Sequence, residues 1–174
     1  MAVLSPFNLK MWIADNRDLL KPPVGNKCIY VNAENFIVMI VGGPNARKDY
    51  HYNESEELYY QLEGNIVVKI IDEGVQKDIE INEGDIFLLP PKTPHSPQRG
   101  PNTVGLVIEK VRETEQDGFL WYCEKCGKKL YEEYKVINDI VTQLPPVMEN
   151  FYADENKRTC SKCGSLMGLP IKKG

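Results

Sequence analysis

The sequence predicts a mainly β protein, folded as a sandwich or barrel of short antiparallel strands. Between residues 27 and 110 the chain consists of short runs rich in β-branched and aromatic residues, separated by turn residues such as Gly, Asn, Asp and Pro. Many short strands at this spacing are typical of sandwiches and barrels. The predicted strands are residues 36–41, 57–62, 66–71, 78–81, 85–89 and 103–109.

An amphipathic pattern before this region predicts one helix. The helix would begin near Asn8 and must end before the two prolines at positions 22 and 23, because proline disrupts a helix interior. The apolar residues that share one face are Leu9, Trp12, Ile13 and Leu20. We expect one compact domain with three parts: an N-terminal helical segment over 1–26, a barrel over 27–111 and a C-terminal extension over 112–174.

Composition and charge exclude some function classes. The chain has 174 residues, 42% of them hydrophobic and 26% charged, with a net charge of −4. It has no basic surplus that would attract nucleic acid or an anionic membrane. The first residues do not resemble a signal or transit peptide, and no apolar stretch approaches the ~18 residues that cross a bilayer. These features predict a cytoplasmic protein with no nucleic-acid or membrane partner.

Two histidines and one glutamate form the first candidate site. His51 and His95 are the only histidines, and both are expected at turn edges between strands. Glu57 follows His51 by six residues, so in an extended backbone both side chains would point to the same face. Two imidazoles and a carboxylate suit non-heme iron(II), because they leave coordination positions open for substrate and dioxygen. The alternative is a hydrogen-bonded histidine pair beside a solvated glutamate.

Two arginines and a second glutamate are candidates for substrate binding. Arg47 precedes His51 by four residues and Arg99 follows His95 by four, so each should face the same cavity as its histidine. A guanidinium group there could bind a carboxylate through two hydrogen bonds. Glu109 ends an apolar run that suggests burial. The alternatives are surface cations for the arginines and a solvated charge at a strand end for Glu109.

Four of the five cysteines form a second candidate metal site. They occur as two Cys-x-x-Cys pairs, each followed by a glycine that permits a tight turn. In a reducing compartment this pattern indicates a metal and not disulfides. The residues are Cys123, Cys126, Cys160 and Cys163. Four thiolates suit zinc or a single iron of rubredoxin type, and the closed shell favours a structural role. Cys28 is left over, and we expect a buried free thiol.

The spacing around the histidines resembles the two cupin motifs. Residues 84–95, GDIFLLPPKTPH, match the second motif, and His51, Glu57 and Gly64 match the first. This resemblance implies a double-stranded β-helix, the jelly-roll barrel of cupins. Two departures are that Asn53 stands where many cupins have another histidine and Asn45 replaces an opening glycine. The first departure disfavours a four-ligand manganese cupin.

Longer segments resemble the 3-hydroxyanthranilate 3,4-dioxygenase family, and the likeness covers nearly the whole chain. The segments are 19–26 (LLKPPVGN), 41–51 (VGGPNARKDYH), 83–99 (EGDIFLLPPKTPHSPQR) and 117–123 (DGFLWYC). The resemblance implies an extradiol-type dioxygenase that cleaves the ring of 3-hydroxyanthranilate between its hydroxyl- and amino-bearing carbons. The product would be 2-amino-3-carboxymuconate semialdehyde, which closes to quinolinate, the kynurenine-pathway precursor of NAD.

The same resemblance implies residue roles. Iron(II) would be held by His51, Glu57 and His95, and the hydroxyl and amino groups of the substrate would chelate it. Arg99 would contact the substrate carboxylate, Arg47 the carboxylate or dioxygen, and Glu109 the chelating groups. The resemblance also implies a homodimer. Two alternatives remain open: a non-catalytic cupin that binds an aromatic acid, and another metal-dependent cupin enzyme, such as a thiol dioxygenase or an isomerase.

Overall fold

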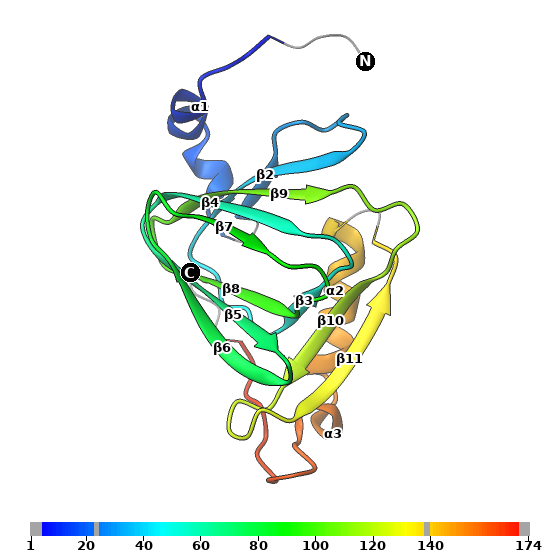
Figure 1. Ribbon diagram of the computed structural model, residues 1–174. Helices are drawn as coiled ribbons and strands as arrows, with labels where there is room; N and C mark the ends of the chain where they lie inside the picture. The colour runs from blue at the N-terminus through cyan, green and yellow to red at the C-terminus, as the bar shows by residue number, and fades with distance from the viewer. Residues whose placement is uncertain (1–4, 23–24, 138–139, 171–174) are drawn as a thin grey trace.

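The computed structural model describes residues 5–22, 25–137 and 140–170 and contains two antiparallel sheets that face each other (Figure 1). The five-stranded sheet has, in spatial order, β1 (Asn26–Cys28), β2 (Phe36–Gly42), β9 (Val104–Lys110), β4 (Glu57–Glu63) and β7 (Ile86–Leu89). The six-stranded sheet has β11 (Lys129–Lys135), β10 (Asp117–Tyr122), β3 (Tyr50–Tyr52), β8 (His95–Arg99), β5 (Ile66–Asp72) and β6 (Val75–Ile81). This mainly β architecture confirms the predicted cupin barrel.

The barrel core lies between the two sheets and follows the alternation of each strand. On β5, Ile66, Val68 and Ile70 are buried, while the residues between them are partly exposed. They pack against Tyr59 of β4 and Leu89 of β7 from the opposite sheet. Each such apolar side chain contributes about 1.5–3 kcal/mol when it is fully buried. This core holds the sheets together and leaves polar residues at one end of the barrel interior.

The N-terminal helix is shorter than the sequence predicted. Helix α1 (Leu9–Asp15) begins as expected, with the Asn8 side chain accepting a hydrogen bond from the Met11 backbone N–H. The chain leaves the α-helix at Asn16, whose side-chain amide donates to the Trp12 carbonyl. A 3-10 turn (Arg17–Leu20) follows, and its end lies directly against the backbone of β2. A Cβ at Gly42 would lie 2.1 Å from the Leu20 carbonyl oxygen, so only glycine fits there.

All six predicted strands are present, and the predicted placement at a turn edge is confirmed for His95 but wrong for His51. His51 lies inside β3 and His95 begins β8, and these two strands pair with each other. Strand β3 has only three residues, too few to show a pattern, and β8 contains Pro97 and no β-branched or aromatic residue apart from His95, so neither strand is identified from sequence. Their neighbours in the sheet, and not local propensity, decide their conformation.

The C-terminal part of the chain continues the six-stranded sheet. Strands β10 and β11 form a hairpin whose first strand pairs with β3. Helices α2 (Ile140–Tyr152) and α3 (Glu155–Arg158) follow, and Figure 1 shows α2 lying beside β10. The sequence did not predict α2, because prolines 145 and 146 lie inside it. A second core explains why the helix forms: Trp121 stacks on Phe151 with ring centroids 4.3 Å apart.

No helix in the described parts of the chain combines the length and the apolar character needed to cross a membrane.

Candidate active site and four-cysteine site

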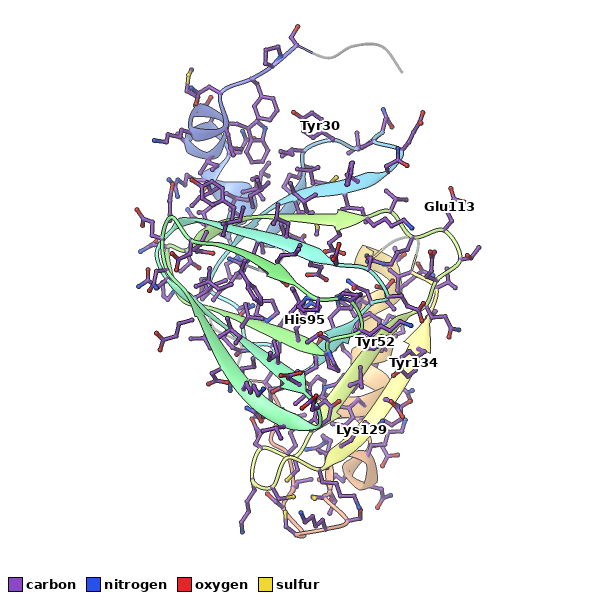
Figure 2. The ribbon with its side chains drawn as sticks, viewed as in Figure 1. Tyr30, Tyr52, His95, Glu113, Lys129 and Tyr134 are labelled. Carbon is purple, nitrogen blue, oxygen red and sulfur yellow. The ribbon has the colours of Figure 1, made fainter. Side chains whose placement is uncertain are left out.

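His51, Glu57 and His95 meet in the barrel interior. Their candidate ligand atoms all lie within 4.8 Å of one another. Glu57 Oε1 is 3.2 Å from His95 Nε2 and 3.5 Å from His51 Nδ1. Figure 2 shows His95 in the space between the sheets. The three residues therefore can hold one metal ion.

The reason for this convergence differs from the predicted one. The sequence argument assumed an extended backbone from His51 to Glu57. In the structure the chain bends at residues 54 and 55, and Glu57 belongs to the opposite sheet from His51. The side chains meet because the two sheets face each other, and not because they share a strand face.

Glu57 is held as a buried carboxylate by two hydrogen-bond donors. Its side chain is 2% exposed, and Asn53 Nδ2 and the Tyr59 hydroxyl each donate to it at 2.6 Å. Burial disfavours the charge, but His95 and His51 outweigh this effect and hold the pKa of Glu57 well below its usual range. Asn53 occupies the position where many cupins have another histidine, so it supports a ligand instead of being one.

Each histidine has a fixed orientation. His95 Nδ1 donates to the Thr93 carbonyl at 3.0 Å, which turns Nε2 toward Glu57. His51 Nε2 lies 2.7 Å from Asp117 Oδ1, and its ring stacks on Phe119. Burial opposes protonation of His51, but the hydrogen bonds with Asp117 and Glu57 raise its pKa to about 9. Two oriented imidazoles and one carboxylate form a donor set that fits a ferrous ion.

Arg99 is a buried guanidinium without an acidic partner among the described residues. It is 3% exposed, and Gln61 Oε1 accepts a hydrogen bond from it at 3.4 Å. Burial lowers the pKa of Arg99 to about 10, so the side chain stays protonated at neutral pH. It ends the strand that His95 begins, and both residues are buried, in agreement with the predicted shared face. The surface-cation alternative is therefore wrong for Arg99.

Arg47 reaches the site by another route than the predicted one. It lies between residues 44 and 48, outside any strand, so a shared strand parity with His51 does not apply. Its guanidinium pairs with the buried Asp49, a partner that the sequence analysis missed. Burial opposes the charge of Arg47, but Asp49 and, to a smaller extent, Tyr59 and Glu57 raise its pKa.

Glu109 faces the same interior and is not a solvated strand end. It is 8% exposed and lies opposite Glu57 in the pairing of β9 with β4. Burial and the nearby Glu57 charge raise the pKa of Glu109, although Arg112 pairs with it at 2.9 Å. A carboxylate with a raised pKa beside a metal site is suited to proton transfer. The sequence analysis missed Arg112 and Asp117 because both lie in or after a polar segment that resembles a linker.

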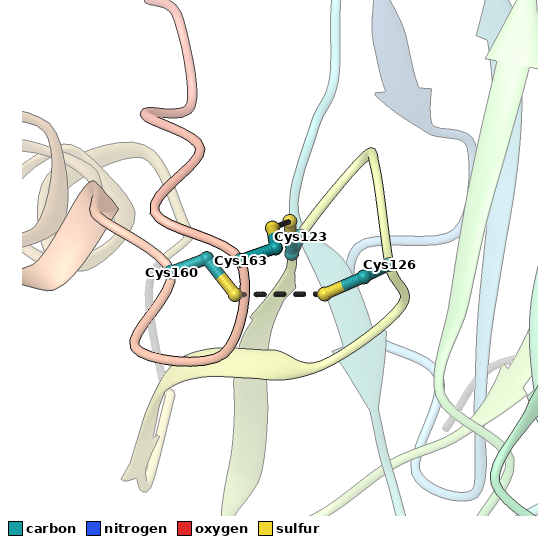
Figure 3. Close-up of side chains that lie close together, drawn as sticks. All are labelled: Cys123, Cys126, Cys160 and Cys163. Atoms are coloured by element: carbon teal, nitrogen blue, oxygen red, sulfur yellow. Dashed lines mark hydrogen bonds between the residues drawn. The ribbon is translucent and has the colours of Figure 1, made fainter.

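The four cysteines meet just after the last residue of β10, Tyr122, whereas Asp117 at the start of this strand contacts His51 (Figure 3). Cys123 Sγ is 3.6 Å from Cys163 Sγ, and Cys126 Sγ is 3.5 Å from Cys160 Sγ. A tetrahedral zinc with Zn–S bonds of about 2.3 Å separates its sulfurs by about 3.8 Å. The two glycines after the pairs have φ values of 71° and 70°, as the tight turns require. The structure therefore brings together four thiols that can hold one metal ion.

A two-sheet barrel with two histidines and a carboxylate in its interior defines a cupin with a potential metal site. The family model for 3-hydroxyanthranilic acid dioxygenase matches residues 1–152. The chain belongs to this family.

Relatives agree with this assignment. The chain is 54% identical to a 3-hydroxyanthranilate 3,4-dioxygenase of Xanthomonas euvesicatoria pv. vesicatoria, over 97% of this chain and 95% of that protein. It is 51% identical to the enzyme of the same name from Jannaschia sp., over 95% and 93% of the two chains. Among solved structures, a cupin-2 domain protein from Shewanella frigidimarina aligns with a TM-score of 0.47 and 15% identity, over 57% of this chain and 92% of that one.

Proposed function

We propose that this protein is an iron(II)-dependent 3-hydroxyanthranilate 3,4-dioxygenase. Its substrates would be 3-hydroxyanthranilate and dioxygen, and its product 2-amino-3-carboxymuconate semialdehyde, in the route to quinolinate and NAD. The observation that carries the proposal is a set of two imidazoles and a carboxylate, together with the buried Arg99 on the His95 strand, which has no acidic partner among the described residues. A binding module for an aromatic acid would explain the guanidinium but not the oriented metal ligands.

The proposed metal site uses His51, Glu57 and His95 as ligands. Iron(II) bound there supplies the one-electron chemistry that lets dioxygen react with an aromatic ring. Asn53 and Tyr59 fix the position of the Glu57 carboxylate by hydrogen bonds, and Thr93 fixes the orientation of the His95 ring. These contacts prepare the ligand atoms before a metal arrives, which reduces the reorganisation needed on binding.

The proposed substrate contacts follow from charge and burial. Arg99 would bind the substrate carboxylate, because a guanidinium buried without an acid partner gains most from an anionic ligand. Arg47, held by Asp49, would contribute positive charge near the carboxylate or dioxygen. Glu109 would accept the proton of the ring hydroxyl, since its pKa is raised by burial and by Glu57.

Oxygen consumption tests the proposal directly. Metal-free protein is loaded with ferrous ion under argon, and 3-hydroxyanthranilate is then added in air-saturated buffer. We expect oxygen uptake that matches substrate loss one for one, and none with zinc in place of iron or with anthranilate, which lacks the ring hydroxyl. An iron-loaded sample that binds the substrate without taking up oxygen would favour the binding module.

The four-cysteine site is proposed to hold zinc or a single iron in a structural role. Four thiolates complete the coordination of a tetrahedral ion and leave no position for a substrate. All five cysteines are free thiols in the structure, and such thiols persist in a reducing compartment. A cytoplasmic location is part of this proposal.

Homodimerisation is proposed through the outer face of the five-stranded sheet. This face carries exposed apolar side chains on neighbouring strands, including Ile86 (68% exposed), Leu88 (52%) and Tyr60 (39%). An apolar sheet face of this kind can pair with its own copy around a twofold axis. Light scattering tests this proposal: Ile86→Lys should shift the mass toward the monomer, whereas Val75→Lys, an exposed position on the other sheet, should not.

A further inference from the structure

A buried ion-pair network contacts the candidate active site from the segment that joins β9 to β10. Arg112 donates to two carboxylates: Nη1 lies 2.9 Å from Glu109 Oε2, and Nη2 lies 3.0 Å from Asp117 Oδ1. The same Asp117 oxygen is 2.7 Å from His51 Nε2. The side chains of Arg112, Glu109 and Asp117 are only 11%, 9% and 3% exposed. The network therefore runs without interruption from Glu109 to His51.

The contact between His51 Nε2 and Asp117 determines the direction of the other ring nitrogen, Nδ1. In its neutral form, an imidazole that donates Nε2–H to a carboxylate has its lone pair on Nδ1, and Nδ1 is the atom that faces Glu57 at 3.5 Å. Phe119, two residues after Asp117 on β10, stacks on the same ring at 5.7 Å between centroids. One strand thus fixes both the tautomer and the plane of a candidate metal ligand.

Burial argues against a purely structural ion pair. Removing a charge from water costs several kcal/mol, so buried charges are retained where their geometry serves a purpose or where several partners compensate. The exposed pair Arg17–Glu63 shows that this chain also forms ion pairs on its surface, where the cost is small. The two terminal amino groups of Arg112 instead pair with Glu109 and Asp117, which both lie at the candidate active site.

We propose that Asp117 is a positioning residue for His51. Arg112 holds Asp117 and Glu109 in place at the same time, so one side chain orients both the candidate metal ligand His51 and the carboxylate of Glu109 that would contact the substrate. This inference rests on the proposed metal site and substrate. Arg112 and Asp117 act through their neighbours and do not touch the substrate or the metal themselves.

The first test is metal affinity, measured by competition with a chelator. Asp117→Asn keeps the shape of the side chain and removes the charge that holds His51 and Arg112. We expect about 10- to 100-fold weaker iron binding at the histidine site, the usual cost of losing a partner of a metal ligand. The four-cysteine site of the same molecule is an internal control and should keep its metal. Asp72→Asn, which removes the carboxylate of an exposed ion pair with Lys77, should change the metal affinity of neither site.

The second test separates the two functions of Arg112. Arg112→Met should weaken iron binding as Asp117→Asn does, and in addition lower kcat/KM by up to ~100-fold at saturating iron, because Glu109 loses its anchor. Asp117→Asn should leave KM nearly unchanged once iron is saturating. Arg112→Lys, which keeps the cation, should recover part of the metal affinity.

Three outcomes would overturn the inference. Wild-type iron affinity in both Asp117→Asn and Arg112→Met would show that the network does not position His51. Loss of metal from both sites of Asp117→Asn, with a lower Tm, would show that the network only stabilises the fold. Weaker iron binding in Arg112→Met without a change in kcat/KM would remove the link to Glu109. These affinity measurements stand even if the wild-type protein takes up no oxygen, so the failure of the proposed function can be told apart.

Discussion

The two candidate metal sites of this protein are built in opposite ways. The histidine site takes its residues from three strands in two sheets, and its members are of two chemical kinds, with Glu57 and His95 buried and His51 half-buried. The cysteine site consists of two short turns with identical spacing and four identical ligand types. The first has a buried guanidinium, Arg99, at the end of the strand that begins with His95, whereas the second consists of thiols alone. A site that performs chemistry needs an open side, while a site that only fastens two loops does not.

The largest expected effect comes from removing a ligand of the open site. His95→Ala should reduce oxygen uptake by more than the roughly 100-fold that loss of a supporting residue costs. Elemental analysis should show that the cysteine site keeps its metal. Retained activity in His95→Ala would remove the basis for calling the histidine site catalytic.

Two buried arginines, one near each site, sharpen the comparison. Arg99→Ala should raise KM for 3-hydroxyanthranilate by about 100-fold or more, since an interaction with a buried charge contributes about 2–5 kcal/mol, while iron content stays near wild type. Arg158→Ala is the matched control. Arg158 donates to the Met167 carbonyl at 2.8 Å beside the cysteine site, so its loss should lower Tm and leave KM unchanged. Iron loss from Arg99→Ala would mean that the residue supports the metal and not the substrate.

Removing a ligand from the closed site should affect stability first. Cys160→Ser should release the metal of the cysteine site and lower Tm by roughly 10 °C, because structural metal ions contribute directly to folding. The iron affinity of the histidine site should change far less. Cys28→Ser, which removes a thiol outside both sites, should stay within about 0.5 kcal/mol of the wild-type free energy of unfolding. Equal destabilisation by both variants would contradict a structural metal.

The smallest expected effect is a pH dependence that differs between the sites. In metal-free protein the pKa of His51 is raised to about 9, with burial opposing and Asp117 and Glu57 favouring protonation. A raised pKa adds stability that is complete below the ordinary value near 6.5 and disappears as the pH rises through about 9. Thermal unfolding should therefore show Tm falling over this range. The His51→Gln protein should lack this part of the slope.

Acid should act on the other site, because thiolates must be deprotonated to bind a metal. Metal release from the cysteine site should therefore increase as the pH falls. A chromogenic chelator would follow this release in wild-type protein and in His51→Gln, where it should be the same. Release that followed the titration of the histidine site would contradict the independence of the two sites.

Much of this protein could be predicted from its sequence. Six strands were predicted from their composition, and the cysteine site follows from spacing that is local and chemically specific. His51, Glu57 and His95 were identified by residue type and motif, although the argument from strand parity was wrong. Helix α2 was missed because its prolines argue against a helix, and the packing of Phe151 on Trp121 overrides that propensity.

The sequence by itself determined which residues can bind metal, because ligand chemistry belongs to each side chain and does not depend on its neighbours. Only the tertiary structure decided how those residues are supported. Asp117 meets His51 across 66 positions of the sequence, and no local pattern encodes such a contact. The burial that lowers the pKa of Arg99 and raises the pKa of Glu109 likewise exists only once the two sheets have closed over them. Short-range spacing in the sequence identifies the candidate ligands, whereas the charge state and the orientation of their side chains arise from long-range packing.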